Sequence, residues 1–465
     1  MRNLFIVFYC LVSALTIKAN GQDSLWKIQT TDYHGTYYGA TVANGGIGIL
    51  PWKEPFSIRH VMLNHVFDSA TPQDVSRVLR GINPFNLQMQ INGQTVNGDN
   101  ISRWEQCIDM KEATHNTHFT CDGKADVSYS ICALRNLPYA GLVRVEVVAL
   151  GDMYLTVSNP IEIPDEYKNI GSKLVNVNVN GNDIKIVRTW ALSKYREQKV
   201  SASSAFIYDK NSSVQQQYNG SGQISISLKK GEKFFFTLLG AVCTGRDFID
   251  PYNESDREVI YGAKEGLTRL MDGHRKLWNE MWKGDIVIEG DDEAQRTVRF
   301  ALYNLYSNAR KGSRLSIPPF GLSSQGYNGH IFWDTEFWMY PPMLFMNQGI
   351  ARTMMDYRTD RLEAACQKAL SYGYDGAMFP WESDDAGEEA CPTWALTGPF
   401  EHHITADIAI AAWNYYCMSG DQRWLREEGF PLMEKVAEFW VSRVEKNEDG
   451  SYSIRNVVCA DEYAE

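Results

Sequence analysis

Residues 256–282 read DREVIYGAKEGLTRLMDGHRKLWNEMW, and the chain changes character at this segment. Its apolar residues recur every three or four positions, which is typical of the buried face of an α-helix. The sequence before it alternates apolar and polar residues with a period of two, as β-strands do, whereas the sequence after it keeps the helical period. This change of period predicts a chain of two parts, with β-structure first and helices second.

The first part, residues 22–254, is predicted to be an antiparallel β-sandwich domain. Its short alternating segments are separated by Gly, Asn and Asp, and Asn180-Gly181-Asn182 has the composition of a tight hairpin turn. Successive short strands joined by such turns are typical of a sandwich. The clearest predicted strands are GLVRVEVVAL (141–150), NDIKIVRTWAL (182–192), GQISISLKKG (222–231) and KFFFTLLGAV (233–242).

The second part is predicted to be a helical linker over residues 255–290 and a helical domain over residues 291–465. Several helical segments begin near Asp and end near Gly, as capped helices do. Their wide apolar faces predict helices that pack around one another, with functional residues on loops at one end. A toroidal barrel fits this pattern, and a plain helical bundle fits it nearly as well. The predicted helices are 291–312, 349–373, 402–420 and 421–447.

Charge and targeting signals restrict the partners. The 465 residues carry a formal net charge of −12 without a basic cluster, so neither nucleic acid nor an anionic membrane surface is an expected partner. Residues 1–21 have the pattern of a signal peptide, with Arg2 before an apolar run and a cleavage point near Ala19 to Gln22. We therefore expect a protein exported to the periplasm or the extracellular space, without a membrane span.

Two loops between the predicted helices combine tryptophan with carboxylates. GYNGHIFWDTEFWMYPP (326–342) contains Trp333 and Asp334, and YDGAMFPWESDDAGEEACP (374–392) contains Trp381 and Glu382. Indole faces stack on sugar rings and carboxylates accept hydrogen bonds from hydroxyls, so these four residues are predicted to bind a sugar. The other acids of the second loop are predicted to cap the following helix: Asp384, Asp385, Glu388 and Glu389.

Metal and cofactor chemistry has no support in the sequence. His330, His402 and His403 lack the spacing of a metal motif, and neither a G-x-S-x-G elbow nor a dinucleotide fingerprint is found. No metal or cofactor is expected. The eight cysteines after Cys10 are scattered singly, and most are expected to be buried apolar residues, although one bridge among Cys107, Cys121 and Cys132 stays open.

The chain ends in VVCADEYAE (457–465), where three carboxylates surround Tyr463. Glycosidases commonly use a pair of carboxylic acids, one of which protonates the leaving oxygen from a confined, partly apolar site. Glu462, which follows the apolar VVCA, suits that role. A solvated acidic loop explains the segment equally well from spacing alone.

Four blocks in this order, GHIFWDTEFWMYPPML, AMFPWESDDAGEE, EHHITADIAIAAWNYY and ADEY, together resemble glycoside hydrolase family 65. That family holds maltose, trehalose and kojibiose phosphorylases and related α-glucosidases. The resemblance runs from about residue 30 to the end of the sequence. It implies a β-sandwich, a helical linker and an (α/α)₆ barrel that is incomplete here, and it is compatible with a homodimer.

The resemblance also implies roles for single residues. Glu462, in the DEY motif, matches the family's general acid, and the two Trp-acid pairs match the subsite that holds the glucose to be released. His403 and Asp407 lie in the matching HITADIA block and are expected to support this subsite. The catalytic base of a hydrolase, or the phosphate site of a phosphorylase, is implied to lie beyond the DEY motif.

The resemblance therefore predicts an inverting enzyme that acts on a small α-glucoside. An export signal favours hydrolysis over phosphorolysis, and Ala464 stands where the family's phosphorylases usually have His. Kojibiose, with its α-1,2 bond, is the leading substrate hypothesis. A disaccharide phosphorylase for maltose, trehalose or kojibiose and a non-catalytic carbohydrate-binding protein are the alternatives.

Overall fold

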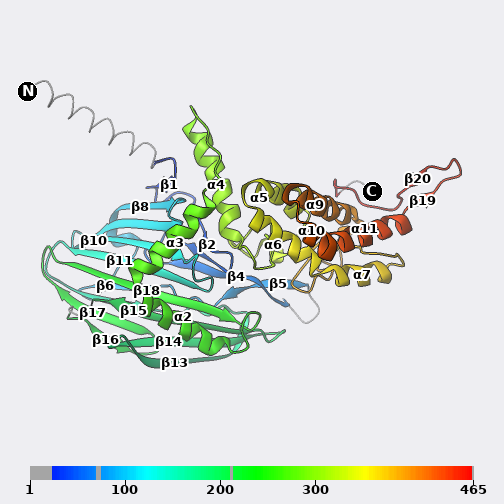
Figure 1. Ribbon diagram of the computed structural model, residues 1–465. Helices are drawn as coiled ribbons and strands as arrows, with labels where there is room; N and C mark the ends of the chain where they lie inside the picture. The colour runs from blue at the N-terminus through cyan, green and yellow to red at the C-terminus, as the bar shows by residue number, and fades with distance from the viewer. Residues whose placement is uncertain (1–23, 70–74, 210–212, 463–465) are drawn as a thin grey trace, which may run out of the picture.

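The computed structural model describes residues 24–69, 75–209 and 213–462. The predicted signal peptide, residues 1–21, lies outside these ranges. Figure 1 shows a β-rich part formed by the first half of the chain and a group of helices formed by the second half. The predicted order of β-structure followed by helices is confirmed.

Three antiparallel sheets make up the β-rich part. The largest has nine strands in the order β1 (Lys27–Thr30), β8 (Ile101–Asp109), β9 (Thr114–Cys121), β10 (Ala125–Ala133), β11 (Ala140–Ala149), β18 (Lys233–Thr244), β15 (Lys199–Tyr208), β14 (Asn182–Ser193) and β13 (Tyr167–Val179). The second has the order β16 (Gln215–Tyr218), β17 (Gly222–Leu228), β12 (Met153–Asn159), β6 (Gln88–Ile91) and β7 (Gln94–Thr95). The third has the order β2 (Val42–Ala43), β3 (Ile47–Pro51), β4 (Ile58–Ser69) and β5 (Ser76–Gly81).

The predicted hairpin turn joins β13 to β14. Val179 pairs with Asn182, and the two residues between them have positive φ angles, 52° at Asn180 and 76° at Gly181. Positive φ at both central residues matches the right-handed twist of the flanking strands, and Asn-Gly adopts it at low cost. The four predicted strands correspond to β11, β14, β17 and β18.

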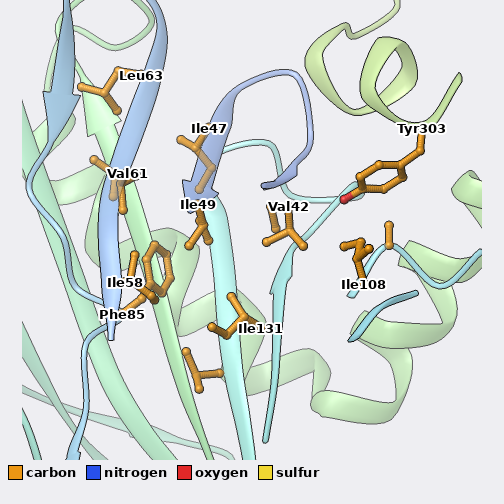
Figure 2. Packing of buried hydrophobic residues seen from close by; sticks show 14 of the residues in the cluster. Val42, Ile47, Ile49, Ile58, Val61, Leu63, Phe85, Ile108, Ile131 and Tyr303 are labelled. Carbon is orange, nitrogen blue, oxygen red and sulfur yellow. The ribbon is translucent and has the colours of Figure 1, made fainter. Parts of the chain in front are cut away.

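One hydrophobic core runs from the sheets into the helices. Val42, Ile49 and Ile131 from the sheets belong to the same buried cluster as Tyr303 of α4 (Asp292–Asn308), as Figure 2 shows. The Tyr303 hydroxyl donates a hydrogen bond to the carbonyl of Thr41 at 3.0 Å, which satisfies its polar atom in this apolar setting. The two parts of the chain are therefore packed together rather than tethered.

The segment that opens the helical half forms two helices, not the single helix predicted. α2 (Pro251–Glu265) and α3 (Leu267–Met281) are separated by Gly266, whose φ is 81°. Such a backbone conformation ends a helix, and glycine adopts it without the steric cost of a β-carbon. α2 packs on β15 and β18 of the large sheet (Figure 1).

Two of the remaining predicted helices are interrupted, whereas the helices predicted at 291–312 and 402–420 are confirmed as α4 (Asp292–Asn308) and α9 (His403–Ser419). The predicted helix 349–373 is two helices, because the chain turns at Asp360 and Arg361. The predicted helix 421–447 is a short helix, a π-turn and a longer helix. The elements after α4 are η2 (Gly326–Gly329), η3 (Thr335–Met339), α5 (Tyr340–Met346), α6 (Gln348–Thr359), α7 (Leu362–Ser371), α8 (Thr397–Phe400), α9 (His403–Ser419), α10 (Gln422–Trp424), η4 (Leu425–Gly429), α11 (Phe430–Arg443), β19 (Glu445–Lys446) and β20 (Tyr452–Ser453).

Helix ends follow local signals where they are strong. Asp291 caps α4 by accepting hydrogen bonds from two backbone amides of the first turn, and Gly420 ends α9 in the left-handed conformation. Within the described residues, no helix is both long enough and apolar enough to cross a membrane.

Candidate active site

The two Trp-acid loops singled out in the sequence lie together. Ile331 of the first loop and Ser383 of the second exchange backbone hydrogen bonds of 2.9 and 3.0 Å. This short bridge brings the adjoining side chains into one region, although η3, α5, α6 and α7 lie between Ile331 and Ser383 in the chain. The pairing supports the prediction that they form a common site.

Two indoles and an imidazole form the apolar part of this region. The ring centroids of Trp333 and Trp381 lie 6.5 Å apart, and the ring of His403 lies 4.8 Å from Trp333 and 5.5 Å from Trp381. Trp381 is only 3% exposed, whereas Trp333 is half-buried. Trp333 is therefore the indole with surface left for a sugar ring.

The two carboxylates beside the indoles differ in their partners. The Asp334 side chain is half-buried and has no hydrogen-bond partner among the described residues. One oxygen of Glu382, Oε2, lies 2.7 Å from Nδ1 of His330, while Oε1 has no partner in the described part of the chain. Asp334 and Oε1 of Glu382 are thus available to accept hydrogen bonds from a ligand.

His403 at the start of α9 is held between two carboxylates. Its Nδ1 lies 2.7 Å from Asp407 one turn along the helix, and its Nε2 lies 3.0 Å from Glu401. Burial lowers the pKa of His403, but the hydrogen bonds that its ring donates to Asp407 and Glu401 outweigh this effect and raise the pKa to about 9. His403 is therefore a cation at neutral pH.

Glu401 is the most deeply buried carboxylate of this group. Its side chain is fully buried, and its second oxygen, Oε2, has no hydrogen-bond partner among the described residues. Burial raises the pKa of Glu401, His403 lowers it, and the charge of Glu462 raises it further. The sequence analysis did not single out Glu401, although it directly precedes the histidine pair in the EHHITADIA block.

The segment before Glu462 is attached to this cluster. The amide of Val458 donates a hydrogen bond of 3.0 Å to the carbonyl of Phe400, and Val458 pairs with Glu401 in a parallel bridge. Glu462 itself is exposed, which differs from the confined site expected for a proton donor. The structure nevertheless brings Glu462 within electrostatic reach of Glu401.

An ion pair beneath the first loop is almost completely buried. Arg358 of α6 binds both oxygens of Glu336, at 2.7 and 2.8 Å, and both side chains are at most 1% exposed. Arg358 also donates to the carbonyl of Phe332, next to Trp333. This bidentate pair fixes the backbone that carries Trp333 and Asp334.

Known protein families account for this arrangement. Residues 39–281 match the N-terminal domain of glycosyl hydrolase family 65, and residues 299–465 match the central catalytic domain of the same family. The chain belongs to glycoside hydrolase family 65. The kojibiose hydrolase of Flavobacterium johnsoniae is 41% identical, over 99% of this chain and 69% of its own. The kojibiose hydrolase of Mucilaginibacter mallensis is 37% identical, over 100% of this chain and 70% of its own.

More distant members of family 65 include phosphorylases. The kojibiose phosphorylase of Thermoanaerobacter brockii is 39% identical over 45% of this chain and 29% of its own. Among solved structures, a putative kojibiose phosphorylase from the human microbiome has a TM-score of 0.80 and 16% identity, covering 95% of this chain and 62% of that one. The fold of this family 65 chain is therefore a β-sandwich followed by a helical region of the kind found in these enzymes.

The acids at the end of the second loop do not cap a helix, contrary to the prediction. Asp384 accepts hydrogen bonds from the Ser76 hydroxyl (2.8 Å) and Arg196 (3.3 Å), both from the β-rich part. Glu389 accepts from the amides of Trp381 and Glu382 at 2.8 and 3.0 Å. Asp385 pairs with Arg196, and Glu388 is exposed. Glu389 thus organises its own loop, whereas Asp384 and Asp385 attach this loop to the β-rich part.

Metal-binding and disulfide chemistry are not visible in the described residues. No group of three or more His, Cys, Asp or Glu side chains there has the arrangement of a metal site. All eight described cysteines are free, so the bridge left open among Cys107, Cys121 and Cys132 is not formed. Cys121, Cys132, Cys243 and Cys391 are buried.

Proposed function

We propose that this chain is part of an exported, inverting α-glucosidase that releases glucose from a small α-glucoside, with kojibiose as the preferred substrate. One observation carries the proposal: the loops with Trp333-Asp334 and Trp381-Glu382 meet beside the cluster that adjoins Glu462. The names of the two relatives that align with nearly all of this chain support kojibiose as the substrate.

In this proposal the indoles and carboxylates bind the glucose unit whose bond is cleaved. Trp333 stacks on the apolar face of the ring, and Asp334 and Glu382 accept hydrogen bonds from its hydroxyls. Trp381 is packed against Trp333 and His403, so it supports the position of Trp333 rather than offering a free face. These contacts fix the glycosidic bond relative to Glu462.

Glu462 is proposed to act as general acid by protonating the departing glycosidic oxygen. Water attacks the anomeric carbon from the opposite face and gives its proton to a second carboxylate, the general base expected beyond the DEY motif, so the product glucose has the β configuration. Glu401, His403 and Asp407 are proposed to support Glu462 without contacting the substrate. Glu401 pairs through its backbone with Val458 in the segment before Glu462, and the cation of His403 lies between the carboxylates of Glu401 and Asp407. The helical region is proposed to form part of an (α/α)₆ barrel.

The full-length protein provides the decisive assay. Kojibiose, maltose and trehalose are supplied with and without inorganic phosphate, and the products are followed by NMR. Free β-glucose from kojibiose without phosphate supports the proposal. Glucose 1-phosphate that forms only when phosphate is present identifies a phosphorylase instead, and binding without turnover identifies a carbohydrate-binding protein.

Export is tested separately. N-terminal sequencing of the protein from fractionated cells is expected to find a mature protein that begins near Ala19 to Gln22 outside the cytoplasm. A cytoplasmic protein that retains residues 1–21 contradicts this part of the proposal.

A further inference from the structure

The loop that carries Glu382 is attached to the β-rich part at two points. At the first, the Ser76 hydroxyl at the start of β5 donates to Asp384. At the second, Arg196 in the turn between β14 and β15 donates to Asp384 at 3.3 Å and Asp385 at 3.0 Å. The backbone of that turn is itself fixed, because Asp68 of β4 accepts from the Arg196 amide at 2.6 Å. The β-rich part therefore restrains a loop of the candidate active site.

His330 connects β5 directly to Glu382. Its ring is fully buried and stacks on Phe67 of β4 with centroids 5.7 Å apart. Nε2 lies 2.8 Å from the Ser76 carbonyl oxygen, and Nδ1 lies 2.7 Å from Glu382 Oε2. The ring thus spans from a strand of the sandwich to a carboxylate that is 52 residues further along the chain.

The hydrogen-bond partners determine the direction of each bond. A carbonyl oxygen can only accept, so Nε2 of His330 carries a hydrogen and donates to Ser76. The bond from Nδ1 to Glu382 must then also contain a proton, located on the imidazole or on the carboxyl group. The Ser76 hydroxyl does not change this, because its own hydrogen is donated to Asp384.

We propose that His330 is a positioning residue that orients Glu382 for the sugar. The β-sandwich contributes to this positioning through Ser76, which binds His330 and Asp384, and through Arg196, which binds Asp384. Oε2 of Glu382 is hydrogen-bonded to His330, which leaves Oε1 to accept a hydrogen bond from a ligand. The bond to His330 also fixes the orientation of the carboxylate. This inference rests on the proposed function insofar as Glu382 binds the substrate. It assigns to the β-rich part a role in substrate affinity.

Two substitutions of His330 separate this role from a merely structural one. The amide nitrogen of asparagine lies near the position of Nδ1, so His330→Asn retains a donor to Glu382. The amide nitrogen of glutamine lies near the position of Nε2, so His330→Gln retains the donor to Ser76 and leaves Oε2 of Glu382 without one. Both variants keep one of the two hydrogen bonds, which makes each the control for the other.

Steady-state kinetics of the full-length enzyme on kojibiose measure the difference. His330→Gln is expected to raise KM about tenfold relative to His330→Asn, because a hydrogen bond to a charged group is lost. kcat is expected to change less than about threefold, since Glu382 holds the glucose unit equally in the ground and transition states. Equal KM values for the two variants, or a loss confined to kcat, overturn the inference.

A substitution of the partly exposed Arg196 tests the same inference if both His330 variants fail to fold. Arg196→Gln removes the second attachment, whose side chain is 35% exposed, and is expected to raise KM about two- to fivefold. The matched control is Arg257→Gln on α2, where an exposed arginine pairs with Glu254 away from the loops, and its KM is expected to stay unchanged. An Arg196→Gln enzyme with the KM of the control also overturns the inference.

Failure of the proposed function is distinguishable from failure of this inference. If the wild-type enzyme acts only with phosphate, the same KM comparison is made for phosphorolysis of kojibiose. If it has no turnover, calorimetric Kd values for kojibiose replace KM. A higher KM or Kd for His330→Gln than for His330→Asn in either assay supports the positioning role, although the hydrolase proposal has failed. Equal values for the two variants overturn the positioning role.

Discussion

Replacing His403 with glutamine should remove a pH-dependent part of the stability of the helical region. His403 lies between Asp407 and Glu401, at 2.7 and 3.0 Å, and its side chain is only 26% exposed. Glutamine keeps a hydrogen-bond donor of similar length but never carries a charge. The substitution therefore tests the charge of His403 rather than its size.

The size of the effect follows from the pKa of His403. Its two carboxylate partners raise the pKa to about 9 against the burial of the ring, while the ordinary value of 6.5 applies to the unfolded chain. A group whose pKa is higher in the folded state stabilises most below the unfolded pKa, and this contribution is lost as the pH rises through the folded pKa. The shift corresponds to about 3 kcal/mol of unfolding free energy, lost between pH 6.5 and about 9.

Five other histidines titrate below this window. Burial lowers the pKa of each of the following residues below its ordinary value, so that they titrate at lower pH: His60, His65, His115, His274 and His402. His118 is the matched control, because it forms an exposed pair with Asp126 at 3.0 Å on the β-sheet.

Urea unfolding of the full-length protein, followed by tryptophan fluorescence at pH values from 6.5 to 9.5, measures the effect. Over this range His403→Gln is expected to lose about 3 kcal/mol less unfolding free energy than the wild type and His118→Gln. The buried thiols, whose pKa values are raised by burial, contribute a further loss at the alkaline end that is common to all three proteins. Asp407→Asn, which removes one of the two anions, is expected to fall between them. A His403→Gln protein with the same dependence on pH as the wild type would refute the assigned charge.

Three further predictions concern activity and the buried ion pair. Glu462→Gln in the full-length enzyme should lower kcat on kojibiose about 10²- to 10⁴-fold, while the affinity for glucose, measured by calorimetry, stays the same. A variant with the wild-type kcat would mean that another residue is the general acid. Trp333→Ala should raise KM about two- to tenfold, because the stacking of the indole on the sugar is lost. The control is Trp338→Ala, since Trp338 is 61% exposed in the same segment, and its KM should stay unchanged. Equal increases in KM for the two variants would argue against stacking by Trp333. Glu336→Gln should cost about 3–5 kcal/mol, seen as a Tm lower by about 3–5 °C, because it leaves Arg358 buried and unpaired. The double variant Glu336→Gln/Arg358→Met should recover part of that loss, and an additive double variant would contradict the pairing.

The sequence by itself determined the type of secondary structure, the hairpin turn and the helix ends, because each depends on residues that are close in the chain. The change of period near residue 256, the Asn180-Gly181 turn and the caps at Asp291 and Gly420 all act within a few residues. Composition was also enough to single out the loops of Trp333-Asp334 and Trp381-Glu382, since tryptophan next to a carboxylate is a local pattern. These features are readable because turns and caps are satisfied by hydrogen bonds between close neighbours in the sequence.

Only the tertiary structure decided where helices with continuous apolar periodicity are interrupted and which partners the buried polar side chains take. Gly266 ends a helix whose apolar periodicity continues past it, and the helix before this turn, α2, packs on the large sheet. Asp384 bonds to Ser76, 308 residues away, instead of capping a helix. The link from Ser76 through His330 to Glu382 likewise joins separate parts of the chain, and no periodicity in the sequence reports it. A buried polar group takes whichever partner the packed domains bring within hydrogen-bond distance, and that choice exists only after the sandwich and the helices have packed together.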